Sequence, residues 1–287
     1  MKKNDERLYP ELEKLKPLWE LSEELDTEIQ DRGLEPKYPT GLIELDGLIW
    51  GLHKKQIVTI GAVTGGGKTH FTIYLLTKLA NRGARIVDFT LEMTEVELCE
   101  RIMCNVCRLD SDLLRRGLLK KEYNEHKANF MSWAEDTNVL ITNAYGRKFN
   151  EVLRVCEITQ PDFVIIDYIQ LIGCENFKDK KAAIDDFLIR IGDLSKDMNF
   201  GVINVSQLNR EVASSDRPYK HHLMWSSVLE HHSHTILLLH HDFVKKDFYI
   251  FVEKQRHGRS GKVKVDYEPQ FSNFGDIEWS STLGKNN

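Results

Sequence analysis

One segment constrains the fold of this chain more than any other: a glycine-rich loop between an apolar run and an apolar helical pattern. It runs from Ala62 to Thr69, with three consecutive glycines before Lys68 and Thr69. Glycines let backbone N–H groups converge on phosphate oxygens, and the following helix N-terminus adds its positive dipole end. This is a Walker A pattern, although Ala62 stands where glycine is usual. We therefore predict a phosphate site made by Ala62, Val63, Thr64, Gly65, Gly66, Gly67, Lys68, Thr69 and His70.

Two side chains of the loop have distinct expected roles. Lys68 is expected to reach the β and γ phosphates, and Thr69 is expected to ligate Mg²⁺. A second apolar run, 163–166, ends in Asp167, which is the Walker B form. Apolar runs that end in Asp are common, but a Walker A loop earlier in the same chain strengthens the Walker B interpretation of this one. Asp167 is therefore expected to hold Mg²⁺ together with Thr69.

Glu92 is a third candidate, just after the predicted strand 85–89. If that strand lies beside the nucleotide-bearing strand, the carboxylate points into the crevice at the strand ends. There it can orient and deprotonate a water molecule. The alternative is a glutamate in the first turn of the next helix, which stabilises that helix through its dipole. The residues alone favour this second interpretation.

Strands and helices alternate from Gln56 onward, and most strand candidates are unbroken apolar runs. Such runs are typical of strands covered on both faces, so we predict an α/β fold with a mostly parallel sheet. The strand candidates are 57–60, 85–89, 138–142, 163–166, 201–205 and 235–239. The helix candidates are 69–81, 95–116, 120–135, 147–159 and 180–199. Segments 247–252 and 262–267 flank a glycine-rich turn and predict a C-terminal hairpin at the sheet edge.

An amphipathic arm precedes this body. Apolar residues recur at spacings of three and four from Leu12 to Ile29, which predicts a helix over 11–32 before a proline-containing linker. The apolar face of this helix packs either on its own domain or on a neighbouring subunit. We expect three parts: an arm with its linker over 1–36, an ATPase domain over 37–275 and a loose tail over 276–287.

Composition excludes several classes of protein. With 41% apolar and 29% charged residues, the chain is neither disordered nor of low complexity. No apolar run is long enough to span a membrane, and the N-terminus has no signal-peptide pattern. Five cysteines, an odd number, indicate reduced thiols and a cytoplasmic location. Residues 1–36 hold six Lys or Arg and eleven Asp or Glu, which accounts for the whole net charge of −5 and leaves a neutral body that can carry a basic groove.

Five ordered motifs together resemble the ATPase domain of the bacterial replicative helicase (DnaB) family, which has a RecA-like P-loop fold. The resemblance covers about residues 40–274. Besides the Walker A loop, its motifs are Thr40-Gly41-Leu42-Ile43-Glu44-Leu45-Asp46, Leu91-Glu92-Met93, Asp167-Tyr168-Ile169-Gln170-Leu171, Ser206-Gln207-Leu208-Asn209-Arg210 and Lys254-Gln255-Arg256-His257-Gly258.

The resemblance implies an ATP- and Mg²⁺-dependent motor on single-stranded DNA, and it assigns roles to site residues. Glu92 becomes the catalytic base, which reverses the preference from the residues alone. Gln207 becomes a sensor of the γ-phosphate or the attacking water. Lys254 and Arg256 would enter the ATP site of a neighbouring subunit. A contribution in trans requires an oligomer, which in this family is a ring of six.

Two loops would face the DNA in the channel of such a ring. One follows the Walker B strand and the other follows Gln207. Lys and Arg on such loops suit phosphate contacts without base readout. The predicted DNA contacts are Lys178, Lys180, Lys181, Arg210, Arg217 and Lys220.

The sequence departs from the family pattern in two places. The collar domain that precedes the ATPase domain in the family has no counterpart in residues 1–36, so the usual primase surface is expected to be missing and a primase or loader remains an open partner. The segment 223–242 carries histidines where the family is rich in Arg, Glu and Asp, and seven histidines fall between His221 and His241. Without cysteines among them, we expect polar surface or an interface there rather than a zinc site.

Two other functions fit the same motifs. One is an ATP-switched DNA-binding or recombination protein that does not unwind DNA. The other is a scaffold that assembles with a full-length helicase and regulates it.

Overall fold

The structure is a computed structural model that describes residues 15–30, 36–173, 180–209, 211–212, 215–256 and 258–277. The chain divides into two compact units, Met1–Lys37 and Tyr38–Asn287. Helix α1 (Leu18–Gln30) is the helix of the first unit. The predicted start at Glu11 is wrong for the part described, because residues 15–17 are not helical. Pro17 explains this start, since proline disfavours helical geometry in the residue before it and fits the edge of a helix.

The second unit is built on one sheet, in which the described residues form nine strands in the order β3-β2-β4-β5-β1-β6-β7-β8-β9. The strands from β3 to β6 pair in parallel, and β6 to β9 pair antiparallel. The predicted α/β fold with a mostly parallel sheet is therefore confirmed. The strand bounds are β1 (Ile57–Ala62), β2 (Arg85–Thr90), β3 (Asn138–Asn143), β4 (Phe163–Asp167), β5 (Gly201–Gln207), β6 (Thr235–Asp242), β7 (Asp247–Gln255), β8 (Gly261–Glu268) and β9 (Asn273–Asp276).

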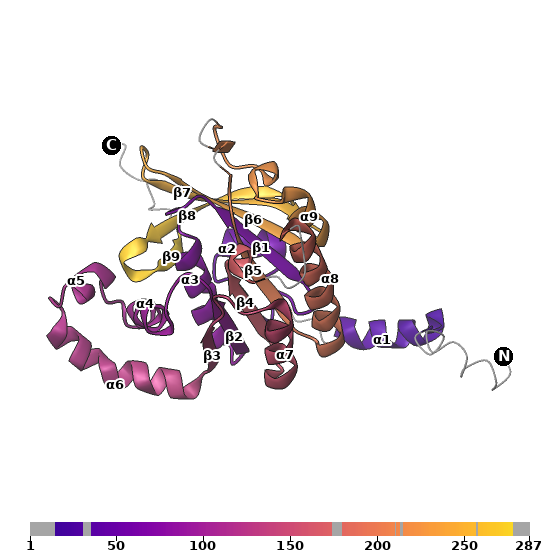
Figure 1. The fold of residues 1–287 in the computed structure, drawn as a ribbon, viewed down its shortest axis with the longest axis horizontal. Helices are drawn as coiled ribbons and strands as arrows, with labels where there is room; N and C mark the ends of the chain where they lie inside the picture. The colour runs from indigo at the N-terminus through magenta and orange to yellow at the C-terminus, as the bar shows by residue number, and fades with distance from the viewer. Residues whose placement is uncertain are drawn as a thin grey trace, which may run out of the picture. The chain divides into compact units, whose positions relative to one another are not determined.

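Helices cover both faces of this sheet, as Figure 1 shows. One face packs against α3 and α4, with Phe71 and Leu75 of α3 in the core. The other face packs against α7, α8 and α9, with Phe187 of α8 in a second core. The helix bounds are α2 (Ile43–Ile49), α3 (Lys68–Ala80), α4 (Glu95–Cys107), α5 (Ser111–Arg115), α6 (Lys120–Asp136), α7 (Phe149–Thr159), α8 (Lys180–Met198) and α9 (Ser226–His232).

The strand sequences explain this layering. Strands β1 and β4 are buried along their whole length, as expected for strands covered on both faces. Strand β3 at the edge is only partly buried. The parallel register places Ala62 opposite Gln207 and Thr90 opposite Asp167. The carboxyl ends of β2, β4, β5 and β1 therefore lie along one edge of the sheet.

Two sequence-based predictions differ from the structure, and two of its helices were not predicted. The helix expected over 95–116 is two helices, because Arg108 turns to a left-handed conformation and Asp110 caps α5 through the N–H groups of Asp112 and Leu113. The hairpin of β7 and β8 is not at the edge, because β9 pairs beyond β8. Helices α2 and α9 were not expected. Each has seven residues, too short to display a helical period clearly.

Gly201 at the start of β5 provides a test of this packing. A Cβ atom there would lie 2.6 Å from the Phe163 ring and 2.8 Å from the carbonyl oxygen of His53. We expect Gly201→Ala to lower the free energy of unfolding by about 1–3 kcal/mol, since the backbone must shift to admit the methyl group. Urea denaturation followed by circular dichroism measures the change.

Gly275→Ala is the matched control, because Gly275 also lies in a strand and its added Cβ would meet open space. We expect this variant to remain within about 0.5 kcal/mol of the wild type. Equal destabilisation by the two substitutions would contradict the overpacking argument.

Candidate functional site

Four neighbouring strands each contribute to one edge of the sheet. Glu92 follows β2, Asp167 ends β4, Gln207 ends β5, and the glycine loop follows β1. The expectation that the strand before Glu92 lies beside the nucleotide-bearing strand is wrong, because β4 and β5 separate β2 from β1. Glu92 nevertheless reaches the same cavity, since parallel strands end at the same edge.

The loop between β1 and α3 requires glycine at two positions. Gly65 has φ of 72° and Gly67 has φ of 84°, a region that residues with a Cβ rarely adopt. At Gly67 a Cβ would also lie 3.2 Å from the ring of Phe248. The loop therefore folds tightly over an aromatic ring of β7, and Gly67 leads directly into the N-terminus of α3.

Lys68 and Thr69 begin α3 and point to different partners. The Lys68 ammonium donates hydrogen bonds to the carbonyl oxygens of Val63 at 2.9 Å and Ala62 at 3.2 Å. The Thr69 hydroxyl donates to Asp167 Oδ2 at 2.9 Å. The Walker A helix and the Walker B strand are thus joined by a direct side-chain contact.

Asp167 is the buried anion of the site. Burial raises the pKa of its carboxyl to about 6, against the opposing effects of the Thr69 hydrogen bond and the Lys68 charge. Burial also lowers the pKa of Lys68, which the charges of Asp167 and Glu92 counteract. Asp167 Oδ1 is buried and has no hydrogen-bond partner among the described residues. A hydroxyl beside a carboxylate with an unused oxygen is a set of hard oxygen donors that fits Mg²⁺.

Glu92 is not part of the first turn of the next helix. Helix α4 begins at Glu95, and Thr94 caps it in a reciprocal capping box with Glu97. The first-turn positions are therefore filled by other acids, and Glu92 is an exposed residue that lines the cavity of the site. This geometry removes the helix-dipole interpretation of Glu92.

A cavity of about 270 Å³ is lined by Lys68, Thr69 and Glu92, whereas Asp167 is hydrogen-bonded to Thr69 but does not line the cavity itself. Of the predicted loop residues, Thr64, Gly65, Gly67, Lys68, Thr69 and His70 line it, whereas Ala62, Val63 and Gly66 do not. Four further lining residues were not predicted as site residues: Met93 and Tyr168 directly follow Glu92 and Asp167, whereas Arg101 and Tyr267 come from α4 and β8. Tyr267 of β8 lies 2.6 Å from His70 Nδ1, measured from its hydroxyl oxygen. Burial, with a smaller effect of Arg101, lowers the pKa of His70 to about 4, so its ring is neutral at pH 7.

Gln207 also lines the cavity, and its amide nitrogen donates to the Thr64 hydroxyl at 2.7 Å. Next to it, Leu208 donates its backbone N–H to the carbonyl of Ala62. The end of β5 is therefore attached to the Walker A loop, and the chain leaves this point as the loop that carries the predicted DNA contacts.

Lys254 and Arg256 lie beside the amino-terminal end of β1, whereas the Walker A loop follows its carboxyl-terminal end. The Arg256 N–H donates to the carbonyl of His234, whose own N–H donates to Ile57 at the start of β1. The Walker A loop follows the other end of β1, and a strand of six residues separates its two ends by about 16 Å. The Lys254 ammonium donates to the carbonyl of Glu230, and the exposed Arg256 side chain donates to the carbonyl of His231. These two residues are not part of the cavity in their own chain.

The predicted DNA contacts fall into three groups. Lys178 and Arg210 lie outside the described residues. Lys180 and Lys181 form the first turn of α8. Arg217 and Lys220 form ion pairs with Glu253 and Glu230, and Arg217 also stacks on Tyr219.

The histidines between residues 221 and 241 do not gather into one site. His232 pairs with Asp185 of α8, and His234 accepts from the backbone of Ile57. Within the described ranges no group of three or more His, Cys, Asp or Glu side chains is placed to hold a metal ion. None of the helices in those ranges combines the length and apolar content that a bilayer span requires.

The fold and this edge of the sheet define a P-loop nucleotide-binding domain, with Walker A and Walker B elements on parallel strands. The sequence model of one protein family, the DnaB-like helicase C terminal domain, matches residues 38–276. The chain therefore belongs to this family, as its motifs indicated.

Known relatives agree with this assignment. The chain is 28% identical to the replicative DNA helicase DnaB of Rickettsia conorii, over 83% of this chain and 57% of the relative. It is 24% identical to the replicative DNA helicase DnaC of Bacillus subtilis, over 84% of this chain and 56% of the relative. The chain thus spans somewhat more than half the length of these relatives.

Two solved structures share the fold. One is an isolated ATPase domain, which superposes with a TM-score of 0.83 at 22% identity, over 91% of this chain and 99% of that one. The other is a DnaB-like replicative helicase studied for its interactions with primase, which gives a TM-score of 0.80 at 22% identity, over 90% of this chain and 66% of that one.

We expect Lys68→Ala to weaken the binding of a Mg²⁺–ATP analogue by roughly 100-fold or more. The substitution removes a cation that can donate to two phosphates, and hydrogen bonds to charged groups contribute about 1.5–3 kcal/mol each. Isothermal titration calorimetry measures the affinity. Lys78→Ala, in the last turn of the same helix, is the control and should bind as the wild type does. Unchanged affinity in Lys68→Ala would overturn the assignment of the loop.

Proposed function

We propose that this chain is an ATP-driven translocase and helicase on single-stranded DNA. The observation that carries the proposal is the convergence of the Walker A loop, Gln207 and Glu92 on one cavity of a DnaB-type domain, with Asp167 hydrogen-bonded to Thr69 of that loop. The proposed cofactors are ATP and Mg²⁺.

Each of these side chains has a chemical role in the proposed hydrolysis. Lys68 binds the β and γ phosphates, while Thr69 and Asp167 hold the cation. When bound, Mg²⁺ neutralises charge that develops on the phosphate oxygens. Glu92 orients the attacking water and accepts its proton. Gln207, which is hydrogen-bonded to the loop through Thr64, is positioned to sense the γ-phosphate and to transmit its loss along the following loop.

Lys254 and Arg256 act on a neighbouring subunit in this proposal. Their distance from the cavity in their own chain supports a role in trans, because the family motif assigns them to ATP hydrolysis. The catalytic unit is then an interface between two copies, and the proposed assembly is a hexamer. In this assembly the stripe of α1, which carries exposed Leu18, Leu21, Leu25 and Ile29 within its own unit, is proposed to dock on an adjacent copy.

The proposed DNA contacts differ in their electrostatic surroundings. Lys180 and Lys181 stand in the first turn of a helix that has no acidic residue there, so their charges and the helix dipole both favour an anion such as a phosphate. Arg217 and Lys220 are each paired with a glutamate, which reduces their attraction for phosphate. The proposed phosphate contacts are therefore Lys180 and Lys181 at the start of α8 together with Arg217 and Lys220, with Lys178 and Arg210 as further proposed contacts.

The remaining parts of the proposal follow from the family. The arm and linker over 1–36, the ATPase domain over 37–275 and the tail over 276–287 are the proposed divisions. The proposed location is the cytoplasm. Primase or a helicase loader is a proposed partner, since one DnaB-like relative was studied with primase.

Strand displacement on a forked DNA substrate tests the function. We expect wild-type protein to release the labelled strand with ATP and Mg²⁺. Glu92→Gln should bind ATP normally but hydrolyse it about 10²–10⁴-fold more slowly, because the amide cannot accept the proton, and it should release no strand. Hydrolysis without displacement would favour the non-unwinding DNA-binding protein, and absent hydrolysis in the wild type would favour the scaffold. Wild-type turnover in Glu92→Gln would remove Glu92 from the mechanism.

Arg256→Ala should bind ATP nearly as well as the wild type but hydrolyse it about 10³–10⁵-fold more slowly, since an arginine finger stabilises charge only in the transition state. Mixing this variant with Lys68→Ala should restore part of the turnover, because some interfaces then join an intact loop to an intact arginine. A steady-state ATPase assay over a range of mixing ratios measures the rescue. The absence of rescue at every ratio would exclude action in trans.

A further inference from the structure

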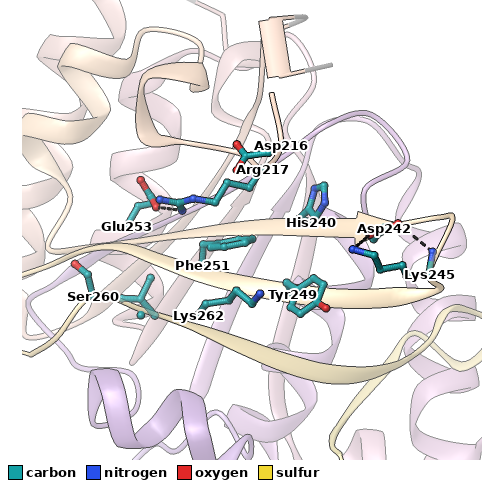
Figure 2. A pocket seen from close by; sticks show the side chains of 12 residues that line it. Asp216, Arg217, His240, Asp242, Lys245, Tyr249, Phe251, Glu253, Ser260 and Lys262 are labelled. Carbon is teal, nitrogen blue, oxygen red and sulfur yellow. Dashed lines mark hydrogen bonds and ion pairs between the residues drawn. The ribbon is translucent and has the colours of Figure 1, made fainter. Parts of the chain in front are cut away.

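A second cavity, larger than the nucleotide site, lies over the antiparallel part of the sheet. It measures about 570 Å³, within the range of small-molecule sites. Figure 2 shows its lining, which comes from β6, β7, β8 and the loop after β5. No step of the proposed ATP hydrolysis uses this cavity.

The floor of the cavity is aromatic. Tyr249 and Phe251 are two residues apart on β7, so their rings project from the same face, with centroids 6.3 Å apart. His240 of β6 pairs with Tyr249, and Lys262 of β8 pairs with Phe251. Figure 2 shows all four side chains turned to the same side of the three strands.

One wall of the cavity is the guanidinium of Arg217. It lies 4.8 Å from the centroid of the Phe251 ring and forms an ion pair with Glu253. These contacts hold the guanidinium plane in place and leave Phe251 only 6% exposed. Tyr249 is the more accessible ring, and its hydroxyl donates to Asp247 at 2.8 Å. A flat ligand entering the cavity therefore meets Tyr249 first.

The carboxylates that line the cavity are already engaged. Glu253 binds Arg217 and the backbone N–H of Lys220. Asp242 accepts from the N–H groups of Val244 and Lys245, and Asp216 accepts from the Tyr219 hydroxyl. Their negative charge is therefore compensated locally.

Lys262 is different from the other lining cations. Its ammonium lies 4.2 Å from the centroid of the Tyr249 ring, and no carboxylate in the described parts of the chain lies within ion-pair distance. The side chain is exposed, so it can leave the ring at little cost. Ser260 adds a hydroxyl to the same end of the cavity. An aromatic ring beside such a cation and a hydroxyl matches the chemistry of a nucleotide, whose base stacks and whose phosphate attracts the cation.

We propose that this cavity binds one nucleotide of single-stranded DNA, with the base stacked on Tyr249 and the neighbouring phosphate held by Lys262. The inference rests on the proposed function and extends it to contacts from Tyr249 and Lys262, which lie on strands outside the two basic loops. Arg217 and Asp216 belong to the loop that starts at Gln207, and Leu208 and Leu223 of that loop pair with each other. A nucleotide in the cavity therefore contacts the same loop that is hydrogen-bonded to the Walker A loop.

The test measures the binding of a fluorescein-labelled oligothymidylate to the full chain, by anisotropy, with a non-hydrolysable ATP analogue present. Removal of a base-stacking aromatic residue typically weakens binding, and we expect Tyr249→Ala to do so about 5- to 150-fold. Tyr249→Phe keeps the ring and should bind within about threefold of the wild type. Lys262→Gln should reduce the slope of log K against log salt concentration by about 0.7, the value for one phosphate contact on a single strand.

Matched controls separate the cavity from general surface effects. Tyr145→Ala removes another exposed tyrosine, beyond β3 at the other end of the sheet, and Lys196→Gln removes a lysine from the last turn of α8. Both should bind DNA as the wild type does. Thermal unfolding shows whether Tyr249→Ala is folded. Equal affinities for Tyr249→Ala and Tyr145→Ala, with wild-type binding intact, would overturn the inference and leave the proposed function standing.

Photocrosslinking separates a DNA strand from a free nucleotide. An oligonucleotide that carries 5-iododeoxyuridine should crosslink to Tyr249, and an excess of unlabelled oligothymidylate should suppress the product. Crosslinking by the free 5-iododeoxyuridine monophosphate, with the oligonucleotide unreactive, would assign the cavity to a mononucleotide and overturn the inference. Failure of the wild type to bind any single-stranded DNA would remove the proposed function as well.

Discussion

Parallel hydrogen bonding among β1, β5, β4 and β2 is the constraint on which the rest of the molecule depends. Because these strands run in the same direction and in register, the residues after each of them emerge at the same edge. Four segments spread along more than half of the sequence thus supply a lysine, a hydroxyl, two carboxylates and an amide to one small region at this edge of the sheet. The two helical layers do not supply most of these groups. Their role is to bury both faces of these strands, which fixes the register of the hydrogen bonds between them.

The antiparallel strands support this edge from the side. Phe248 of β7 lies under Gly67, and Tyr267 of β8 contacts both Phe248 and His70. The Walker A loop is therefore packed against an aromatic cluster that belongs to the C-terminal part of the domain. This packing explains why the loop needs a residue without a side chain at position 67 for steric reasons as well as for its backbone conformation.

Much of the fold was predictable from the sequence, because buried strands and the glycine loop leave strong local signals. The strands β1, β2, β4 and β5 appear as mostly apolar runs, and the Walker motifs mark where two of them end. Strand β9 was missed because its four residues contain one large apolar side chain, and it exists through its pairing with β8. Tyr267 and Arg101 were missed in the cavity for a related reason, since only the tertiary fold brings β8 and α4 beside the loop. The ion pairs of Arg217 with Glu253 and of Lys220 with Glu230 could not be predicted from the sequence either, because both glutamates come from later elements.

The separation of Arg256 from the Walker A loop by the length of β1 has a consequence for symmetry. If each complete site combines the loop end of one copy with the arginine end of another, and the two ends of a copy face different neighbours, the contact is heterologous. In a two-fold dimer, by contrast, both ends of a copy would have to lie within one self-complementary interface. Repeating the contact gives either a closed ring or an open helical chain. A closed ring has as many complete sites as subunits, whereas an open chain always has one fewer, with an unused loop at one end and an unused arginine at the other.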